Sequence, residues 1–251
     1  MKKMKSLARL FLISGLFIAA FTACEKEEEG LLGSNPIGGT IVDADGNVYN
    51  TVQIGDQVWT VENLRTTKYN NGSNIPNLTV PKDWAYAKSG AYCNYNNLES
   101  NVELYGRLYN WFAISTGKLA PAGWRVATEN DWVKLASYLS ANRYLIDTTR
   151  LGSTVTKLIC AKTNWPYSSL SGTPGMNPQY NNTTGFTGLP GGVRWGHGEF
   201  EYIGRYAYWW NSTQHSSDYA RHRYIHNSTA DLLWVPGHLK QCGFAVRLVK
   251  N

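Results

Sequence analysis

The sequence has few charged residues, few cysteines and no long hydrophobic run. Charged side chains make up 17% of its 251 residues, and it contains 4 cysteines. The apolar stretch at residues 10–21 is shorter than the roughly 20 residues that a membrane-spanning helix needs. Hydrophobic residues nevertheless make up 43% and aromatic residues 13%, which is too apolar for a disordered chain. This composition excludes a collagen, a coiled coil and a polytopic membrane protein.

Sequence motifs of common catalytic sites are also missing. The chain has no Gly-x-Ser-x-Gly, no His-Glu-x-x-His, no phosphate loop and no Cys-x-x-Cys. Paired acids for glycoside hydrolysis could come from a set of loop carboxylates, although no spacing distinguishes them: Glu199, Glu201, Asp218 and Asp231. We therefore expect a protein that is not an enzyme and binds no cofactor, with a polysaccharide-active hydrolase as the less favoured alternative.

The five histidines all lie in the last quarter of the chain, and His222 and His226 are four residues apart. On a strand, this spacing directs both side chains to one face but separates them by about 13 Å, too far for one ion. We therefore expect stacking or exposed histidines and no metal site.

The net charge of +6 does not indicate a nucleic-acid partner. Four basic residues and no acidic ones lie in residues 1–23, so the remainder holds 20 basic and 18 acidic side chains, a net charge of +2. That charge is too small to predict a phosphate-binding surface.

The amino terminus combines a basic start with the apolar stretch at residues 10–21, as a secretory signal does. The stretch ends in Phe21-Thr22-Ala23-Cys24, which resembles a bacterial lipobox. By this resemblance, residues 1–23 are a lipoprotein signal peptide and Cys24 carries the lipid. Palmitate-type acylation of the new amino terminus would make the membrane attachment stable. The alternative is an ordinary signal peptide followed by a chance cysteine.

Residues 24–39 form an expected tether. Glu25-Lys26-Glu27-Glu28-Glu29 resembles the acidic export signal of outer-membrane surface lipoproteins in Bacteroidetes, although a solvated spacer would look the same. The Gly-rich residues 30–39 are typical of a flexible linker. We expect an outer-membrane, surface-exposed location and a single folded domain at residues 40–251.

The domain is expected to begin with two β-hairpins. Strand-like residues 40–42 and 48–49 flank Asp45-Gly46-Asn47, and residues 52–54 and 58–61 flank Gly55-Asp56-Gln57. Further strands are predicted at residues 206–210, 219–226 and 244–249.

Two helices are predicted between these strands. The first covers residues 104–114, where Leu104, Leu108 and Trp111 would share a face. The second starts at Thr128 and Asp131, which have the spacing of a capping box, and its apolar residues Trp132, Leu135, Ala136 and Leu139 follow at helical spacing. The predicted fold class is α+β, with two helices, a small antiparallel sheet and long irregular loops.

Several motifs along the domain resemble the Fibrobacter succinogenes major paralogous domain family. They are Val58-Trp59-x-x-Glu62-Asn63-Leu64, Tyr105-Gly106-x-Leu108-Tyr109-Asn110-Trp111, Gly123-Trp124-x-Val126-x-Thr128, Gly185-Phe186-Thr187-x-Leu189-Pro190-Gly191-Gly192-x-Arg194, Tyr208-Trp209-Trp210 and Gly243-Phe244-x-Val246-Arg247. The resemblance implies a secreted or lipid-anchored bacterial surface protein.

A more distant likeness concerns the fold. Residues 123–132 and 243–249 look like stretches of formylglycine-generating enzymes, which implies a C-type-lectin-like fold but not their activity. Those enzymes need a cysteine pair near the carboxyl end, and only Cys242 stands there. The calcium motifs of true C-type lectins are also missing, so calcium-dependent sugar binding is not expected.

If Cys24 is lipidated, Cys93, Cys160 and Cys242 remain in a compartment that permits disulfides. A disulfide between Cys160 and Cys242 is the preferred pairing and leaves Cys93 as a buried thiol. Three free thiols are the alternative. Arg247, late in an apolar strand, is expected to pair with a carboxylate such as Glu62.

The loops after residue 164 are rich in aromatic residues interspersed with Asn, Ser and Thr. Such surfaces suit binding, because rings supply contact area and short polar groups supply directed hydrogen bonds. About half of the rings should be structural. The expected exposed ligand-binding residues are Trp165, Trp195, Tyr202 and Trp234. We expect a surface lipoprotein that binds a glycan or a protein partner; the alternative is a structural or adhesive subunit of a surface or pilus-like complex.

Overall fold

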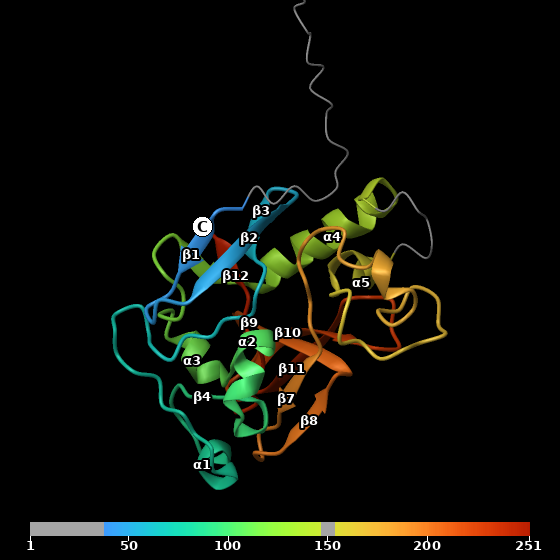
Figure 1. Ribbon diagram of the computed structural model, residues 1–251. Helices are drawn as coiled ribbons and strands as arrows, with labels where there is room; N and C mark the ends of the chain where they lie inside the picture. The colour runs from blue at the N-terminus through green and yellow to red at the C-terminus, as the bar shows by residue number, and fades with distance from the viewer. Residues whose placement is uncertain (1–37, 147–153) are drawn as a thin grey trace, which may run out of the picture. The chain divides into compact units, whose positions relative to one another are not determined.

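Antiparallel sheets and one long helix dominate the computed structural model, which describes residues 38–146 and 154–251 (Figure 1). The described residues belong to one unit of the chain, Leu31–Asn251. The α+β fold class is therefore confirmed, with more strand than helix.

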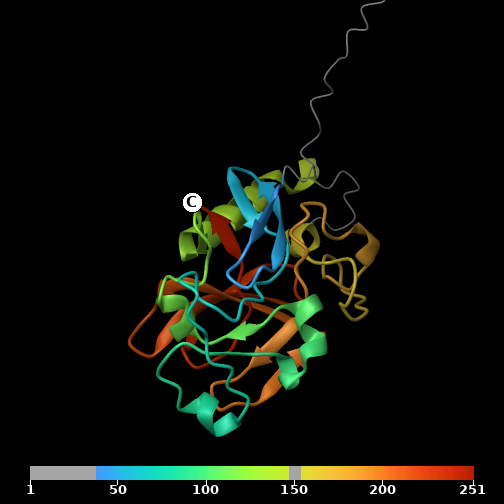
Figure 2. The ribbon, with the colours of Figure 1, turned by 60° about the vertical axis from the view of Figure 1, so that its left-hand side comes forward.

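The largest sheet joins both ends of the domain. Its five antiparallel strands lie in the order β1 (Thr40–Val42), β2 (Val48–Ile54), β3 (Gln57–Thr60), β12 (Leu248–Lys250) and β6 (Trp124–Val126). Figure 2 shows the red carboxyl-terminal strand beside the blue amino-terminal strands. Both predicted hairpins are confirmed, and β2 is shared between them. Of the strand predicted at residues 244–249, the last part forms β12, whereas Phe244 and Ala245 make only isolated bridges to Tyr109 and Trp209.

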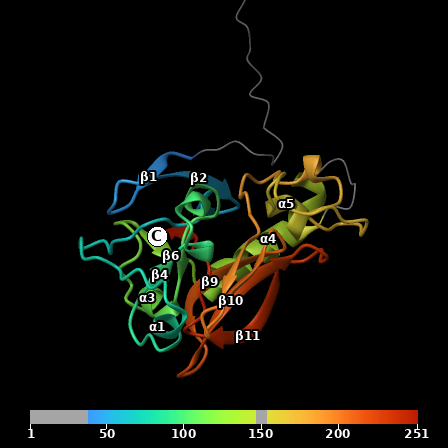
Figure 3. The same cartoon turned by 60° about the horizontal axis from the view of Figure 1, so that its bottom comes forward.

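A second sheet has three antiparallel strands in the order β11 (Leu233–Leu239), β10 (Tyr219–His226) and β9 (Tyr206–Gln214). This confirms the strands predicted at residues 206–210 and 219–226. Two small pairs complete the strands: β4 (Tyr92–Cys93) with β5 (Leu108–Tyr109), and β7 (Gly191–Arg194) with β8 (Phe200–Ile203). Helix α4 (Glu129–Ile146) lies across one face of the three-stranded sheet (Figure 3).

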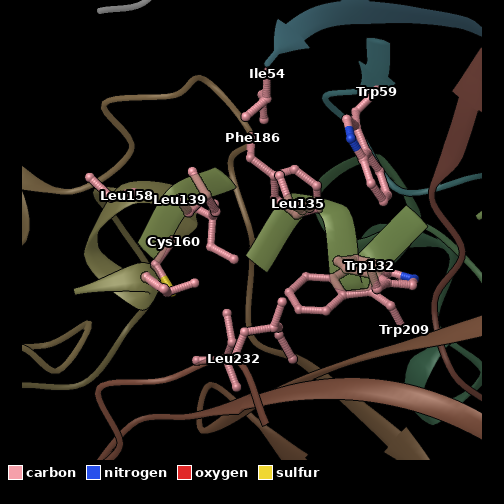
Figure 4. Close-up of a cluster of buried hydrophobic side chains, with 14 of the residues drawn as sticks. Ile54, Trp59, Trp132, Leu135, Leu139, Leu158, Cys160, Phe186, Trp209 and Leu232 are labelled. Atoms are coloured by element: carbon pink, nitrogen blue, oxygen red, sulfur yellow. The ribbon is translucent and has the colours of Figure 1, made fainter. Parts of the chain in front are cut away.

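The start of α4 is the predicted capping box. The backbone N–H and hydroxyl of Thr128 donate to the Asp131 carboxylate at 2.8 and 2.7 Å, and the Asp131 N–H donates back to the Thr128 hydroxyl at 3.2 Å. Beyond this cap, Trp132, Leu135 and Leu139 are fully buried. They pack against Trp209 of β9 and Phe186 in the core cluster of Figure 4. The helix therefore fixes the position of the sheet beneath it.

The helix predicted at residues 104–114 is wrong. In its place lie α2 (Val102–Tyr105), strand β5 and α3 (Trp111–Ser115). Gly106 ends α2 with φ of 75° and ψ of −168°, a conformation that favours glycine. The remaining short helices are α1 (Pro81–Ala85), α5 (Val155–Ile159) and 3-10 turns at Tyr95–Asn97, Glu99–Asn101 and Pro178–Tyr180.

Arg247 forms no ion pair with a carboxylate of the described residues, although the charge of Glu62 partly opposes the effect of burial on its pKa. Its guanidinium is buried and donates to the Asn63 side chain at 2.7 Å and to the backbone oxygens of Thr60, Phe186 and Thr187 at 2.7, 2.8 and 3.0 Å. Burial lowers the pKa of Arg247 to about 9. Arg247 therefore connects β3 to the loop before β7 through hydrogen bonds to neutral oxygens. The expected ion pair with Glu62 is wrong.

The expected Cys160–Cys242 disulfide is also wrong. Cys93, Cys160 and Cys242 are free and buried, so the alternative of three free thiols holds for the described residues. Cys160 lies in the core beneath α4, whereas Cys242 lies in a second cluster around Phe244. Burial raises the pKa of Cys93 and of Cys242 to about 12, so these thiols are unreactive in their present surroundings.

The signal peptide expected at residues 1–23, the lipid attachment at Cys24 and residues 24–37 of the tether lie outside the described residues. Among the described helices, none combines the length and the apolar character needed to cross a membrane.

Candidate functional site

The three-stranded sheet exposes one face lined with rings. Side chains alternate between the two faces of a strand, so Tyr206 and Tyr208 of β9 point the same way. The register pairs Tyr206 with His226 and Tyr208 with Tyr224 of β10. On the opposite face, Trp209 and Ile225 are buried in the core beneath α4. The sequence alternation thus separates a core face from a ring-lined face.

An open groove of about 420 Å³ runs over this ring-lined face. Aromatic and imidazole rings supply most of its lining, which consists of Trp195, Tyr202, Tyr206, Tyr208, His222, Tyr224, His226, Thr229, Leu233, Val235 and His238. None of these lining residues has a carboxylate, ammonium or guanidinium group. We call this feature the aromatic groove.

The rings in the aromatic groove are stacked on one another. Tyr206 and Tyr208 lie 5.5 Å apart with planes only 6° from parallel, and Tyr206 stacks on His226 at 4.2 Å. Tyr208 in turn stacks on Tyr224 at 5.6 Å and on buried Phe244 at 4.9 Å. Because each ring is held by its neighbours, binding would immobilise few side-chain rotamers.

Trp195 and Tyr202 close one side of the aromatic groove. Trp195 follows β7, and its indole N–H donates to the Glu201 carboxylate at 2.7 Å. The Tyr202 ring meets the Trp195 ring edge-on at 6.2 Å. Tyr202 has φ of 67°, a left-handed conformation that costs a bulky residue roughly 1–3 kcal/mol. The β7–β8 hairpin therefore holds an exposed ring above the groove at a conformational cost.

His222 lies in the floor of the aromatic groove. It is 1% exposed, and neither ring nitrogen has a hydrogen-bond partner among the described residues. Burial, with a smaller contribution from His238, lowers the pKa of His222 to about 3. The ring is neutral at pH 7 and keeps one donor and one acceptor unpaired. Burial also lowers the pKa of His238 and of His226, so the groove is uncharged at neutral pH.

This arrangement suits a neutral ligand that has both flat apolar faces and hydroxyl groups. The rings offer stacking surfaces, and the tyrosine hydroxyls and imidazoles offer donors and acceptors. In residues 38–146 and 154–251, no group of three or more His, Cys, Asp or Glu side chains is placed to hold a metal ion.

Two of the four aromatic residues expected to bind ligand, Trp195 and Tyr202, meet in the aromatic groove. Trp165 does not, and its expected exposure is wrong. It is 8% exposed, belongs to the core cluster beneath α4, and donates its indole N–H to the Gly188 oxygen at 3.1 Å. The long loop around Trp165 packs onto its own apolar residues. The neighbouring Pro166 indicated a loop but not that this loop is buried. Trp234 is 56% exposed but faces the other side of the sheet.

Most residues of the aromatic groove were not singled out from the sequence. Tyr206, Tyr208 and Tyr224 were recognised only as part of an aromatic-rich region, and His222 and His226 only as unsuited to hold one metal. The available signal was the period of two: Tyr206 and Tyr208 on one strand, then His222, Tyr224 and His226 on the next. Two such alternations in neighbouring strands predict one shared ring-lined face.

The four acids considered for glycoside hydrolysis have different surroundings. Glu201 accepts the Trp195 indole N–H, and Glu199 lies 3.4 Å from His197 with both side chains exposed. Asp218 is exposed and accepts from the Ser217 hydroxyl. Asp231 is also exposed.

Comparison with known proteins gives one match. A family model described as the Fibrobacter succinogenes major domain matches residues 52–250, a range that includes the aromatic groove and most of both sheets. Neither the curated proteins nor the solved structures contain a match to the chain.

Proposed function

Since this chain belongs to the Fibrobacter succinogenes major domain family, we propose that it is a non-catalytic cell-surface module that binds a neutral glycan in the aromatic groove. The single observation that supports this most is the stack of rings from Tyr206 to Phe244 beneath an open groove without charged side chains. Sugars have apolar ring faces and hydroxyl edges, and a neutral sugar requires no countercharge.

The unpaired imidazole of His222 adds to this proposal. A buried polar atom without a partner costs free energy, and ligands or ordered water commonly supply the missing bond. A small shift of the rings covering His222 would let a sugar hydroxyl reach one of its nitrogens. The hydroxyl can donate to one imidazole nitrogen or accept from the other, which suits a neutral ring.

The proposed location is the outer face of the outer membrane, with the chain anchored by lipid on Cys24. The lipobox-like residues 21–24 and the acidic residues after them support this location. An extracellular sugar ligand and a surface anchor fit one role, the retention of glycan at the cell surface.

We also propose that the fold is C-type-lectin-like. It has the expected small antiparallel sheet, the long helix α4, and a long irregular segment between α5 and β7. The broken helix around Gly106 is the main departure from the expected pair of helices.

A second candidate function is an adhesive or structural subunit that binds protein. It is favoured by an apolar hollow of about 540 Å³ next to the aromatic groove, which shares Trp195 and His238 with it and includes Tyr86, 73% exposed, and Leu239, 42% exposed. Such exposed apolar residues are typical of protein interfaces.

A glycan array probed with residues 34–251 tests the proposal, with Trp195→Ala as the paired variant. We expect binding of one or more neutral glycans by the parent protein and loss of the same signals in the variant. Retention of all signals by folded Trp195→Ala would place the glycan elsewhere. A parent protein that binds no glycan but captures a surface protein through Tyr86 and Leu239 would favour the adhesive subunit instead.

A further inference from the structure

Trp234 does not contribute to the aromatic groove, because it lies on the other face of its strand. In the register of β10 and β11, Val235 pairs with His222 and lines the groove, whereas Trp234 pairs with Arg223. The face of Arg223 and Trp234 is the one covered in part by α4. An indole that is 56% exposed here has no role in the site described above.

Trp234 borders a separate hollow of about 370 Å³ between α4 and the strands β10 and β11. Val133, which is 44% exposed, and Ala136 provide apolar surface from α4. Arg221 and Arg223 provide guanidinium groups from β10, and Glu129 provides a carboxylate from the start of α4. A hollow of this size falls within the range of small-ligand sites, which runs from about 300 to 1,000 Å³.

The single carboxylate of this hollow is already occupied. One oxygen of Glu129 accepts from Arg223, and the other accepts from the Asn211 side chain at 2.7 Å. Arg221 has no carboxylate within ion-pair distance in the described part of the chain. The hollow therefore keeps one uncompensated positive charge beside an exposed indole.

Arg223 also has a hydrogen-bond donor without a partner among the described residues. Its side chain is 6% exposed, and its Nε is buried without a hydrogen-bond partner among the described residues. Burial lowers the pKa of Arg223, Glu129 opposes this effect, and the positive charge of Arg221 adds to it. An anion bound between the two arginines would relieve their mutual repulsion and would meet fork-shaped donors suited to a carboxylate.

We infer that this hollow is a second ligand site, which takes a hexuronate residue of an acidic polysaccharide with its carboxylate on Arg221 and its apolar ring face on Trp234. A sugar acid has both features in one residue, a flat apolar face and an anion at the ring edge. An acidic peptide offers the anion but no rigid face for the indole. The inference does not depend on the proposed neutral-glycan site, since the two sites use opposite faces of one sheet.

Titration calorimetry of residues 31–251 with trigalacturonate tests this site, with the fully methyl-esterified trimer as the uncharged control ligand. We expect the acid to bind, the ester to bind at least about tenfold more weakly, and added salt to weaken the acid alone. Arg221→Gln and Trp234→Ala should each weaken binding of the acid by about tenfold, whereas Arg221→Lys should retain part of the affinity. Both altered residues are at least partly exposed, and circular dichroism would check that the variants fold.

Tyr202→Ala, in the aromatic groove, is the matched control and should leave trigalacturonate binding unchanged. Loss of binding in Tyr202→Ala, equal affinity for acid and ester, or no binding of the acid by the parent protein would each overturn the inference. An aspartate trimer that bound as tightly as trigalacturonate and also required Arg221 would overturn the assignment to sugar. If Arg221→Gln still binds neutral glycan but has lost affinity for trigalacturonate, the two proposed sites bind their ligands independently of each other.

Discussion

Tyr208 and Phe244 stack with ring centroids 4.9 Å apart and planes 13° from parallel. Tyr208 belongs to β9, and Phe244 lies in the segment that leads back to the five-stranded sheet. Phe244 is fully buried, whereas Tyr208 lines the aromatic groove. One ring pair thus connects the hydrophobic core to the ligand-facing rings, so the geometry of the groove depends on core packing.

Replacing Tyr202 or Tyr206 by alanine should weaken glycan binding by about tenfold, because each change removes a ring from the groove. Tyr202→Phe and Tyr206→Phe keep the rings and should lose less, which separates stacking from hydrogen bonding by the hydroxyl. Affinity for the best glycan from the array, measured by calorimetry, gives the comparison.

Tyr167→Ala is the matched control for these changes, since Tyr167 is 84% exposed and outside the groove. Equal losses in Tyr167→Ala and Tyr202→Ala would contradict a specific role for the groove.

Local sequence signals predicted those parts of the fold that depend on neighbouring residues. Thr128 and Asp131 indicated the start of α4, and Asp45-Gly46-Asn47 indicated the first hairpin; both are confirmed because caps and turns depend on adjacent backbone. Gly106 was the missed local signal. Its positive φ breaks a segment whose apolar spacing matched a helix.

The candidate site could be predicted only in part, because exposure is decided by distant segments. Trp165 and Trp234 each stand close to a proline in the sequence, yet Trp165 is covered by the core beneath α4 and Trp234 remains exposed. Likewise, Arg247 finds its partners at Thr60, Asn63 and Phe186. No local pattern places neutral oxygens around a guanidinium, so an ion pair was the simpler expectation.

Cys24→Ser should prevent lipid attachment. The altered protein should no longer incorporate radiolabelled palmitate and should leave the membrane fraction, because stable anchoring depends on the acyl chains. Fractionation of cells that express the parent and variant proteins measures both effects. A variant that stays in the membrane fraction without label would show that another part of the protein holds it there.

Arg247→Met should lower the free energy of unfolding by about 3 kcal/mol, because it leaves several buried oxygen acceptors without a donor. Arg247→Lys should recover little of this loss, since an ammonium cannot reproduce the planar fork of donors. Urea unfolding followed by tryptophan fluorescence measures the difference. Arg205→Met is the control at an exposed arginine, and a similar loss there would contradict the structural role assigned to Arg247.

The buried imidazole of His222 should make the domain less stable in acid. The pKa of His222 falls from 6.5 to about 3 on folding, so between these values the unfolded chain binds a proton that the folded chain does not. The free energy of unfolding should therefore fall as the pH drops below about 6.5, by up to roughly 1.4 kcal/mol per pH unit for this one group. Burial of His226 and His238 acts in the same direction.

His222→Phe should make this dependence shallower, because phenylalanine cannot take up the proton and can keep the ring contacts with Tyr224 and Phe244, whose centroids lie 5.9 and 5.0 Å from that of His222. Urea unfolding at about pH 4, 5, 6 and 7, in even steps across the titration range, measures the slope. His215→Phe is the matched control at an exposed histidine. If the unfolding free energy of His222→Phe depended on pH as steeply as that of the parent protein, His222 would bind its proton equally in the folded and unfolded states. That result would contradict the assignment of His222 as a buried neutral imidazole without a hydrogen-bond partner.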